Sequence, residues 1–211
     1  MTIWVECQQG SPEWLQARCG VITASKFKDA VDKLKSGKPS AKATLYASQI
    51  AMERVTGKPC DEQFVTWQMR QGTEREPMAR LEYESRTGNL ATESGIVLTD
   101  DRMFGYSSDG YVGDDGIIEI KSLASAEKII SMWRDRDFED YIHQIQGGLW
   151  LTGRKWADFV MYAPDLECVG KHLFYQRVQR DESFIEQLAI DLMQFAALVA
   201  QYEAVLRQKA A

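Results

Sequence analysis

The order of its helix and strand patterns predicts an α/β (α+β) fold in a single domain. Three observations support this: helical patterns dominate the N-terminal part, short strand patterns fill residues 95–121, and a strand pair followed by a long helix ends the chain. A length of 211 residues suits one domain of ordinary size. Hydrophobic residues make up 45% and charged residues 27%, which is typical of a globular protein and not of a disordered one.

Three helices are predicted in the N-terminal part. A short helix over 11–20 begins with a serine that can cap it and a proline at its first position. A lysine-rich stretch follows over 26–42. Small and apolar residues along one stripe predict a helix over 43–55, and a third helix, charged on most faces, is predicted over 71–86.

The C-terminal part alternates between strands and helices. Its predicted strands cover 95–98, 103–106, 111–112, 116–121, 156–162 and 171–178. Its predicted helices cover 125–134, 139–151 and 184–206. The Asp-Asp-Gly sequence before the fourth strand is a hairpin turn signal, which predicts that the strands on either side of it are neighbours.

Several classes of protein are excluded by composition and motif. No apolar run approaches the roughly 20 residues of a membrane-spanning helix, and the first residues lack the pattern of a secretory signal. The four cysteines form no CxxC pair, so we expect reduced thiols in a cytoplasmic protein. There is no zinc-binding Cys/His spacing, Walker loop, GxGxxG or GxSxG. The net charge of −6 argues against binding nucleic acid over the whole surface but allows a local basic groove.

The most informative segment brings two acids and a lysine together. Side chains alternate between the faces of a strand, so Glu119 and Lys121 point the same way and Ile120 points to the other face. A carboxylate and an ammonium on a largely apolar strand are costly to desolvate without a partner. Asp109 ends the preceding strand, and a tight meander returns the chain beside it. We therefore expect Asp109, Glu119 and Lys121 to converge.

This trio suits hydrolysis of a phosphodiester. Two carboxylates are hard ligands that favour Mg²⁺ or Mn²⁺, and the main-chain carbonyl of Ile120 is a further candidate ligand. Such a metal polarises the phosphoryl oxygen and lowers the pKa of its bound water. Lys121 would hold the water in line or neutralise charge in the transition state. The ordinary alternatives are a turn for Asp-Gly and a solvated edge pair for Glu-x-Lys, and spacing alone leaves them open.

Four motifs carry a resemblance to a known family. In chain order they are Trp14-Leu15-x-x-Arg18-x-Gly20-Val21-Ile22-Thr23-Ala24-Ser25, Gly72-x-x-x-Glu76-x-x-Ala79-Arg80, Asp109 with Glu119-x-Lys121, and Tyr141-x-x-Gln144-x-Gln146. The third resembles the PD-(D/E)xK nuclease signature. Together they resemble the lambda-exonuclease family of phage-type alkaline exonucleases, which carry the YqaJ viral recombinase domain. One departure is Ser108, which stands where the signature has a turn-shaping proline.

The resemblance implies a PD-(D/E)xK nuclease core in which a central mixed β-sheet is flanked by helices. A single nuclease domain would cover residues 1–211, with its catalytic core at about 70–180. Helices that bind the DNA end would lie within 1–60, and a C-terminal helix would cover 182–208.

The resemblance also implies a role for each acid and for the lysine. Asp109, Glu119 and the Ile120 carbonyl would bind the metal, and two Mg²⁺ ions are expected, with Mn²⁺ as a substitute. Glu76 would be a third acid and metal ligand, although without the family it would be taken for a solvated helix residue. Lys121 would position or activate the water.

A pocket for a 5′-terminal phosphate is implied as well. Its residues would be Arg18, Ser25, Ser107 and Gln144. A guanidinium can hold phosphate with two hydrogen bonds, and hydroxyl and amide donors complete the shell. Taken singly, Arg18 would be a surface cation, Ser25 a helix cap and Gln144 a solvated amide. Tyr141 would position the chain nearby or belong to the core.

Two further residues match family positions that contact DNA. Lys35 would place a cation near the 5′ end, although solubility is the favoured explanation for any single lysine of this stretch. Met69 would wedge between base pairs, because unstacking a terminal pair costs only a few kcal/mol. Burial of Met69 in the core is the alternative.

Family members are ring-shaped homotrimers that digest the 5′-ended strand of duplex DNA to mononucleotides. They leave a 3′ overhang, which a single-strand annealing protein uses for recombination. The resemblance therefore implies a Mg²⁺-dependent 5′-to-3′ exonuclease of phage type, acting on double-stranded DNA ends and not at a membrane. Two alternatives stay open: a metal-dependent endonuclease on the same core, for which a 5′-phosphate pocket has no use, and a non-catalytic module that binds DNA ends.

Overall fold

The computed structural model describes residues 2–60 and 67–208, and only the backbone of 67–69. The helices are α1 (Pro12–Arg18), η1 (Ala24–Lys26), α2 (Phe27–Ala30), α3 (Ala41–Thr56), α4 (Trp67–Thr87), α5 (Ala126–Asp135), η2 (Glu139–Tyr141), α6 (Ile142–Thr152), η3 (Pro164–Val169) and α7 (Glu182–Arg207). The strands are β1 (Thr2–Val5), β2 (Ile22–Thr23), β3 (Ala91–Thr92), β4 (Ile96–Thr99), β5 (Phe104–Tyr106), β6 (Gly110–Val112), β7 (Gly116–Ser122), β8 (Trp156–Tyr162) and β9 (Leu173–Gln179).

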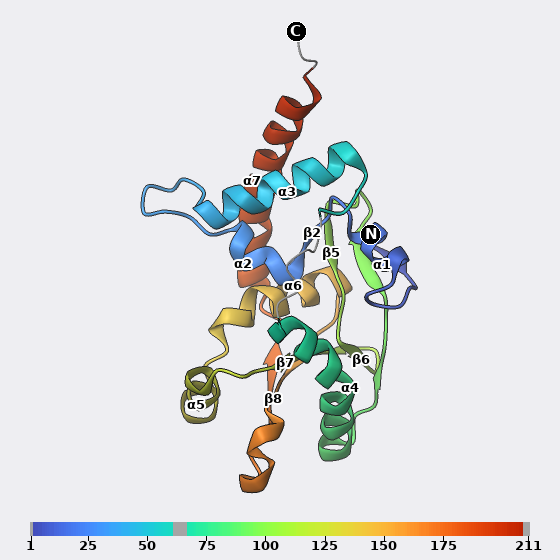
Figure 1. Ribbon diagram of the computed structural model, residues 1–211, viewed down its shortest axis with the longest axis vertical. Coiled ribbons are helices and arrows are strands. Elements are labelled where there is room, and N and C mark those ends of the chain that lie inside the picture. The colour runs from blue at the N-terminus through green and yellow to red at the C-terminus, as the bar shows by residue number, and fades with distance from the viewer. Residues whose placement is uncertain (1, 61–66, 209–211) are drawn as a thin grey trace.

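The strands form two mixed sheets, which helices flank (Figure 1). The larger sheet has the order β3-β6-β7-β8-β9, and only its β7–β8 pair is parallel. The smaller sheet has the order β1-β4-β5-β2, and only its β5–β2 pair is parallel. The predicted mixed α/β domain is therefore confirmed, although its strands are shared between two sheets.

Apolar side chains pack on both faces of the larger sheet. Ile118 and Ile120 of β7 pack with Tyr83 of α4 on one face. Ile117 and Phe159 belong to the main core on the other face, which also contains residues of α3, α6 and α7. Figure 1 shows α3 and α7 together at one end of the molecule and α4 at the other. The two faces of β7 therefore contact different helical layers.

Four of the helices, α1, α3, α5 and α7, begin at a side-chain cap that the sequence contains. The Ser11 hydroxyl accepts a hydrogen bond from the Trp14 amide, Ser40 caps α3 in the same way, and Asp181 caps α7. Capping was recognised before the first helix, whereas the strands β1, β2 and β3 were not predicted. All three are short edge strands, and their few residues carry too little alternation to distinguish them from a loop.

The last helix is more apolar than predicted. By length and composition alone α7 is capable of crossing a membrane. Its apolar stripe nevertheless packs inside the protein, where Leu192 and Val199 are fully buried and Phe195 stacks on Tyr46 of α3 at 5.4 Å between ring centroids. Only 33% of the most apolar 18 residues of α7 are buried, however, and Ile190 and Met193 are exposed, so this packing accounts for part of the hydropathy of α7.

Candidate active site

Asp109 lies directly before β6, in the connection that follows β5, and not at the end of a strand as predicted. Its carboxylate accepts a hydrogen bond of 2.6 Å from the main-chain amide of Ile120 on the neighbouring strand. The turn itself is fixed by Ser108, whose fully buried hydroxyl donates to the Gly110 carbonyl at 2.8 Å. The hydroxyl therefore fixes by hydrogen bonding a turn that a proline would fix by its ring.

Glu119 is completely buried, and three donors surround its carboxylate. The Tyr106 hydroxyl donates to one oxygen at 3.0 Å, the Lys121 ammonium donates to the other at 2.5 Å, and the Gln144 amide donates to that same oxygen. These contacts hold the carboxylate in one orientation and offset the cost of removing its charge from water.

The alternation predicted along β7 is confirmed. Glu119 and Lys121 lie on one face and contact each other, whereas Ile120 packs into the apolar cluster beneath α4 on the other face. Burial alone would lower the pKa of Lys121, but the carboxylates of Glu119 and Asp109 outweigh it and raise this pKa above its usual value. The lysine is therefore held as a cation among acids.

The acids repel one another across a shared cavity. Burial, followed by the charge of Glu119, raises the pKa of Asp109 well above its usual value, and Lys121 only partly opposes this. Burial also raises the pKa of Glu76 on α4, although Arg80 donates to its carboxylate at 2.9 Å and counteracts the shift. The site thus concentrates more negative charge than its cations neutralise.

This donor set fits a hard divalent cation. Asp109, Glu119, Glu76 and Ile120 all line one cavity of about 410 Å³, and carboxylate and carbonyl oxygens are the ligands that Mg²⁺ and Mn²⁺ prefer. A bound cation would relieve the repulsion that raises the pKa of Asp109. Among the residues that the structure describes, no three Asp, Glu, His or Cys side chains form a ready-made cluster, since Glu76 is turned toward Arg80.

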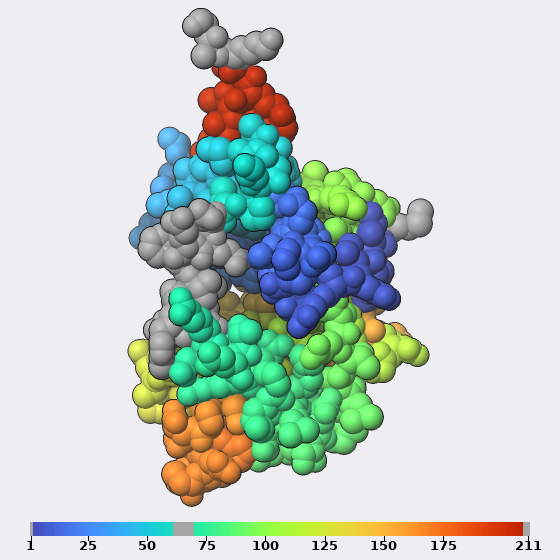
Figure 2. Space-filling model, turned by 45° about the vertical axis from the view of Figure 1, so that its right-hand side comes forward, coloured from blue at the N-terminus to red at the C-terminus, as the bar shows by residue number. Residues whose placement is uncertain are grey.

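The residues predicted to bind a 5′ phosphate line the same cavity. Arg18, Ser25, Ser107 and Gln144 all contribute to its wall, together with the acids and Lys121. Figure 2 shows the surface hollowed between the N-terminal segment, in dark blue, and α4, in green. The first three of these residues come from segments before β7 and Gln144 from α6 after it, so the cavity gathers donors that are distant along the chain.

Trp14, Tyr106 and Gln9 belong to this site although no role was predicted for them. The indole of Trp14 donates to the Ser107 hydroxyl at 2.8 Å, and the Arg18 guanidinium lies 4.1 Å from the centre of the Trp14 ring. Trp14 and Arg18 are four residues apart on α1, a spacing that could have revealed their contact. Tyr106 and Gln9 carried no comparable sequence signal.

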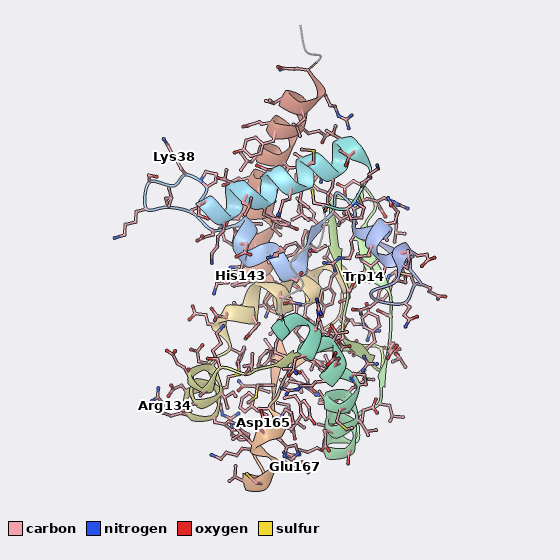
Figure 3. The ribbon with its side chains drawn as sticks, in the orientation of Figure 1. Trp14, Lys38, Arg134, His143, Asp165 and Glu167 are labelled. Atoms are coloured by element: carbon pink, nitrogen blue, oxygen red, sulfur yellow. The ribbon has the colours of Figure 1, made fainter. Side chains whose placement is uncertain are left out.

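Two predicted DNA contacts, Lys35 and Tyr141, do not line the cavity. Lys35 is exposed in the loop between α2 and α3, and Figure 3 shows Lys38 of this loop at the side of the molecule away from Trp14. Tyr141 stacks on Phe159 at 5.1 Å, with the Lys121 ammonium 5.7 Å from its ring centre, so it supports the site from the core. Met69 has a side chain outside the described residues.

The lysine-rich stretch is also less basic than its composition suggests. Lys26 pairs with Asp29 at 3.2 Å, Lys33 pairs with Asp191 at 2.6 Å, and Lys28 pairs with Asp140. Two of these acids lie far along the chain, on α7 and in η2, where sequence reading could not place them. Pairing of this kind reduces the field that the lysines present to DNA.

The comparisons with known proteins agree with this geometry. The family model of the YqaJ-like viral recombinase domain matches residues 13–155. This chain belongs to that family. The resemblance inferred from four motifs is therefore confirmed, and the matched range contains every residue that lines the cavity except Gln9.

Solved structures of relatives share the fold of this family member. LHK-Exo, an alkaline exonuclease from Laribacter hongkongensis, is 34% identical and superposes with a TM-score of 0.80, covering 93% of this chain and 97% of that chain. The structure of LHK-Exo in complex with dAMP gives a TM-score of 0.82 at the same identity and coverage. A phage-related exonuclease from Haemophilus somnus 129PT is 17% identical over 88% of this chain and 94% of that chain, with a TM-score of 0.64. None of the curated proteins matches this sequence.

Proposed function

We propose that this protein is a Mg²⁺-dependent 5′-to-3′ exonuclease that digests the 5′-ended strand of duplex DNA to mononucleotides. The observation that carries the proposal is the single cavity in which Arg18, Ser25, Ser107 and Gln144 adjoin the carboxylates and Lys121. The relative LHK-Exo is an alkaline exonuclease and is 34% identical over nearly the whole chain, which supports the same reaction class.

Each residue of the cavity has a distinct task in this reaction. Asp109, Glu119 and the Ile120 carbonyl would hold Mg²⁺, with Glu76 completing the site for a second ion and Mn²⁺ able to substitute. When bound, the metal would supply a Lewis acid and an activated water. Lys121 keeps its ammonium against Glu119 at 2.5 Å. From there it stabilises the negative charge that develops on the scissile phosphate.

The direction of digestion would follow from the phosphate pocket. Arg18 is oriented by the Trp14 ring beneath it, so its guanidinium is pre-organised to receive a doubly charged terminal phosphate. If that phosphate is held in one part of the cavity, the bond presented to the carboxylates is the next one inward. An endonuclease on the same core would have no use for this pocket, and a non-catalytic end-binding module would have no use for Lys121.

A cleavage assay tests the proposal. Blunt duplex with a 5′ phosphate or a 5′ hydroxyl is incubated with and without Mg²⁺, and the products are separated by size. We expect mononucleotides only with Mg²⁺, a longer 3′-ended strand left behind, and a preference for the 5′ phosphate of roughly 10- to 100-fold, the range for a charge-assisted contact. Internal fragments would instead identify an endonuclease, and absence of cleavage would leave an end-binding module.

Arg18→Ala provides the matched test of polarity. This variant should lose the preference for the 5′ phosphate while it still cleaves. Arg134→Ala is the control, because Arg134 is an exposed arginine on α5 (Figure 3) that pairs with its neighbour Asp135. An unchanged preference in Arg18→Ala would remove Arg18 from the pocket.

We further propose that the protein forms a homotrimeric ring and supplies 3′ overhangs to a single-strand annealing protein. A ring would reconcile a net charge of −6 with DNA binding, because acidic residues would lie outside and basic ones in the channel. Sedimentation equilibrium at micromolar concentration tests the assembly: a mass of three chains supports the ring, and a monomer contradicts it.

A further inference from the structure

A second cavity of about 590 Å³ adjoins the proposed active site. It lies between the N-terminal segment that contains β1, the middle of α4 and the residues before β4, and the two cavities share Gln9, Thr73 and Glu76 in their walls. The Gln9 amide donates to the main-chain carbonyls of Ser94 and Ser108, at 3.3 and 2.7 Å. Gln9 therefore links the loop that positions Asp109 to the wall of the second cavity.

Polar atoms with no partner gather in the second cavity. The Tyr111 hydroxyl, the Ser94 hydroxyl and the Nε of Arg80 are buried, and within the described part of the chain none of them forms a hydrogen bond of full geometry, although the Ser94 hydroxyl is near enough to Tyr111 to counteract the rise that burial causes in its pKa. All three residues line the cavity, and Tyr111 is only 6% exposed. Unsatisfied buried polar atoms are few in folded proteins, so three around one cavity indicate a ligand with a polar edge.

The remaining walls suit a flat apolar surface. Trp4 is an edge-strand tryptophan that is 48% exposed, and its ring centroid lies 5.3 Å from that of Tyr111. Pro77 and Ile96 add apolar surface from α4 and β4. The Arg154 guanidinium already lies 4.4 Å from the centre of the Tyr111 ring, so the exposed ring of Trp4 is the surface on which a planar ring can stack.

The charge of the cavity excludes a phosphate as its occupant. Glu6, Glu76 and Glu93 all contribute to its lining. Arg80 is the cation of this lining, and it already donates to Glu76 at 2.9 Å and to Glu93 at 2.5 Å. A neutral planar group with amine donors complements these carboxylates, whereas an anion would be repelled.

We propose that the second cavity binds the nucleobase of the 5′-terminal nucleotide while the phosphates of that nucleotide occupy the first cavity. The inference rests on the proposed function, since it assigns a place to the base of the nucleotide that is removed. Unpairing a terminal base costs only a few kcal/mol. The shared wall at Gln9, Thr73 and Glu76 allows one nucleotide to reach both cavities.

A fluorescent base provides a test that does not depend on cleavage. Duplex DNA carrying 2-aminopurine at the 5′-terminal position is bound to the Lys121→Ala variant, and an internal dye reports binding by anisotropy. We expect quenching of the terminal base on binding and none for 2-aminopurine five positions inward. Trp4→Ala combined with Lys121→Ala should abolish the quenching, and Trp4→Phe should retain it. Binding without terminal quenching would overturn the inference.

Cleavage rates give a second, independent readout. Wild-type protein should have a KM for duplex with an ordinary terminal nucleotide roughly tenfold below that for duplex ending in an abasic nucleotide, which is within the range for stacking of one base. Tyr111→Phe, which removes only a hydroxyl, should narrow this ratio, and the control Tyr175→Phe on β9 should leave it unchanged. Equal KM values in the wild type would overturn the inference, whereas absence of all cleavage would overturn the proposed function and leave the quenching result to decide the cavity.

Discussion

Two carboxylates are buried on neighbouring strands and have opposite surroundings. Glu119 of β7 and Asp158 of β8 are 0% and 2% exposed, and Asp158 is in register with Ile118, directly before Glu119. The Arg177 guanidinium donates to both oxygens of Asp158 at 2.8 Å, and the Tyr83 hydroxyl adds a third bond of 2.6 Å. Glu119 is also held by three donors, but its lysine is shared with a second acid.

The difference separates a structural carboxylate from a chemical one. Asp158 has a matched, bidentate cation, so its charge is neutralised where it lies. The Glu119 carboxylate lines a cavity with Asp109 and Glu76, where burial and mutual repulsion raise the pKa of both other acids. The carboxylates of Glu119 and Asp158 are buried to the same extent. What distinguishes the functional one is the excess of negative charge around it and the cavity that it lines.

The largest expected effect is the loss of cleavage when Lys121, the lysine beside Glu119, is removed. Lys121→Ala should lower kcat by roughly 10³-fold while duplex binding persists, because the ammonium acts on charge that develops in the transition state. Single-turnover cleavage and filter binding measure the two quantities. Lys128→Ala is the control, since Lys128 lies at the same 5.7 Å from the Tyr141 ring but outside the cavity. Loss of binding in Lys121→Ala would contradict the assigned role.

A substitution at Asp158 should lower the stability of the fold and leave cleavage unchanged. Asp158→Asn weakens the bidentate pair with Arg177 and should lower the free energy of unfolding by about 2 kcal/mol, a value reduced because Arg177 is 44% exposed. Urea denaturation measures it, and cleavage below the unfolding transition should be unchanged. Asp115→Asn, which breaks an exposed pair with Lys155, should cost about 0–1 kcal/mol. Equal effects would show that burial does not matter here.

Metal binding should raise the Tm of the protein through the carboxylates around Glu119 and not through Asp158. At tenfold excess over its dissociation constant, Mg²⁺ adds about 1.4 kcal/mol to folding stability, which is roughly 3–5 °C in Tm for a chain of this size. Asp109→Asn should lose this increase, and Asp158→Asn should retain it from a lower starting Tm. Thermal denaturation with and without Mg²⁺ measures the difference. A Tm increase that survives Asp109→Asn would place the ion elsewhere.

The smallest expected effect is on the pH dependence of folding stability, through Tyr83, which donates to Asp158. Burial and the neighbouring Asp158 raise the pKa of Tyr83 above its usual value of about 10. A group with a raised folded-state pKa stabilises the fold fully below its unfolded pKa, and that stability is lost as pH rises through the folded value. Urea titrations above pH 10 should therefore show a steeper loss in wild type than in Tyr83→Phe. Parallel curves would contradict the assignment.

The sequence predicted those features that depend on neighbours along the chain. The convergence of Glu119 and Lys121 follows from strand alternation, and the hairpin at 114–116 returns the chain beside Asp109. The contacts of Tyr106 and Gln9 depend on how the two sheets meet, which no local pattern encodes. Likewise two of the three acids that pair with the lysine-rich stretch, Asp140 and Asp191, come from segments more than a hundred residues away in chain position.

Ile120 contributes to the active site through its main chain and to the core through its side chain. Its amide anchors the Asp109 carboxylate, and its side chain packs beneath α4. A peptide N–H is present in every residue type except proline. The hydrogen bond to Asp109 therefore does not depend on the side chain at position 120, and aliphatic residues of similar volume can replace Ile120 there. A proline at this position would remove the hydrogen bond to the carboxylate although no polar side chain had changed.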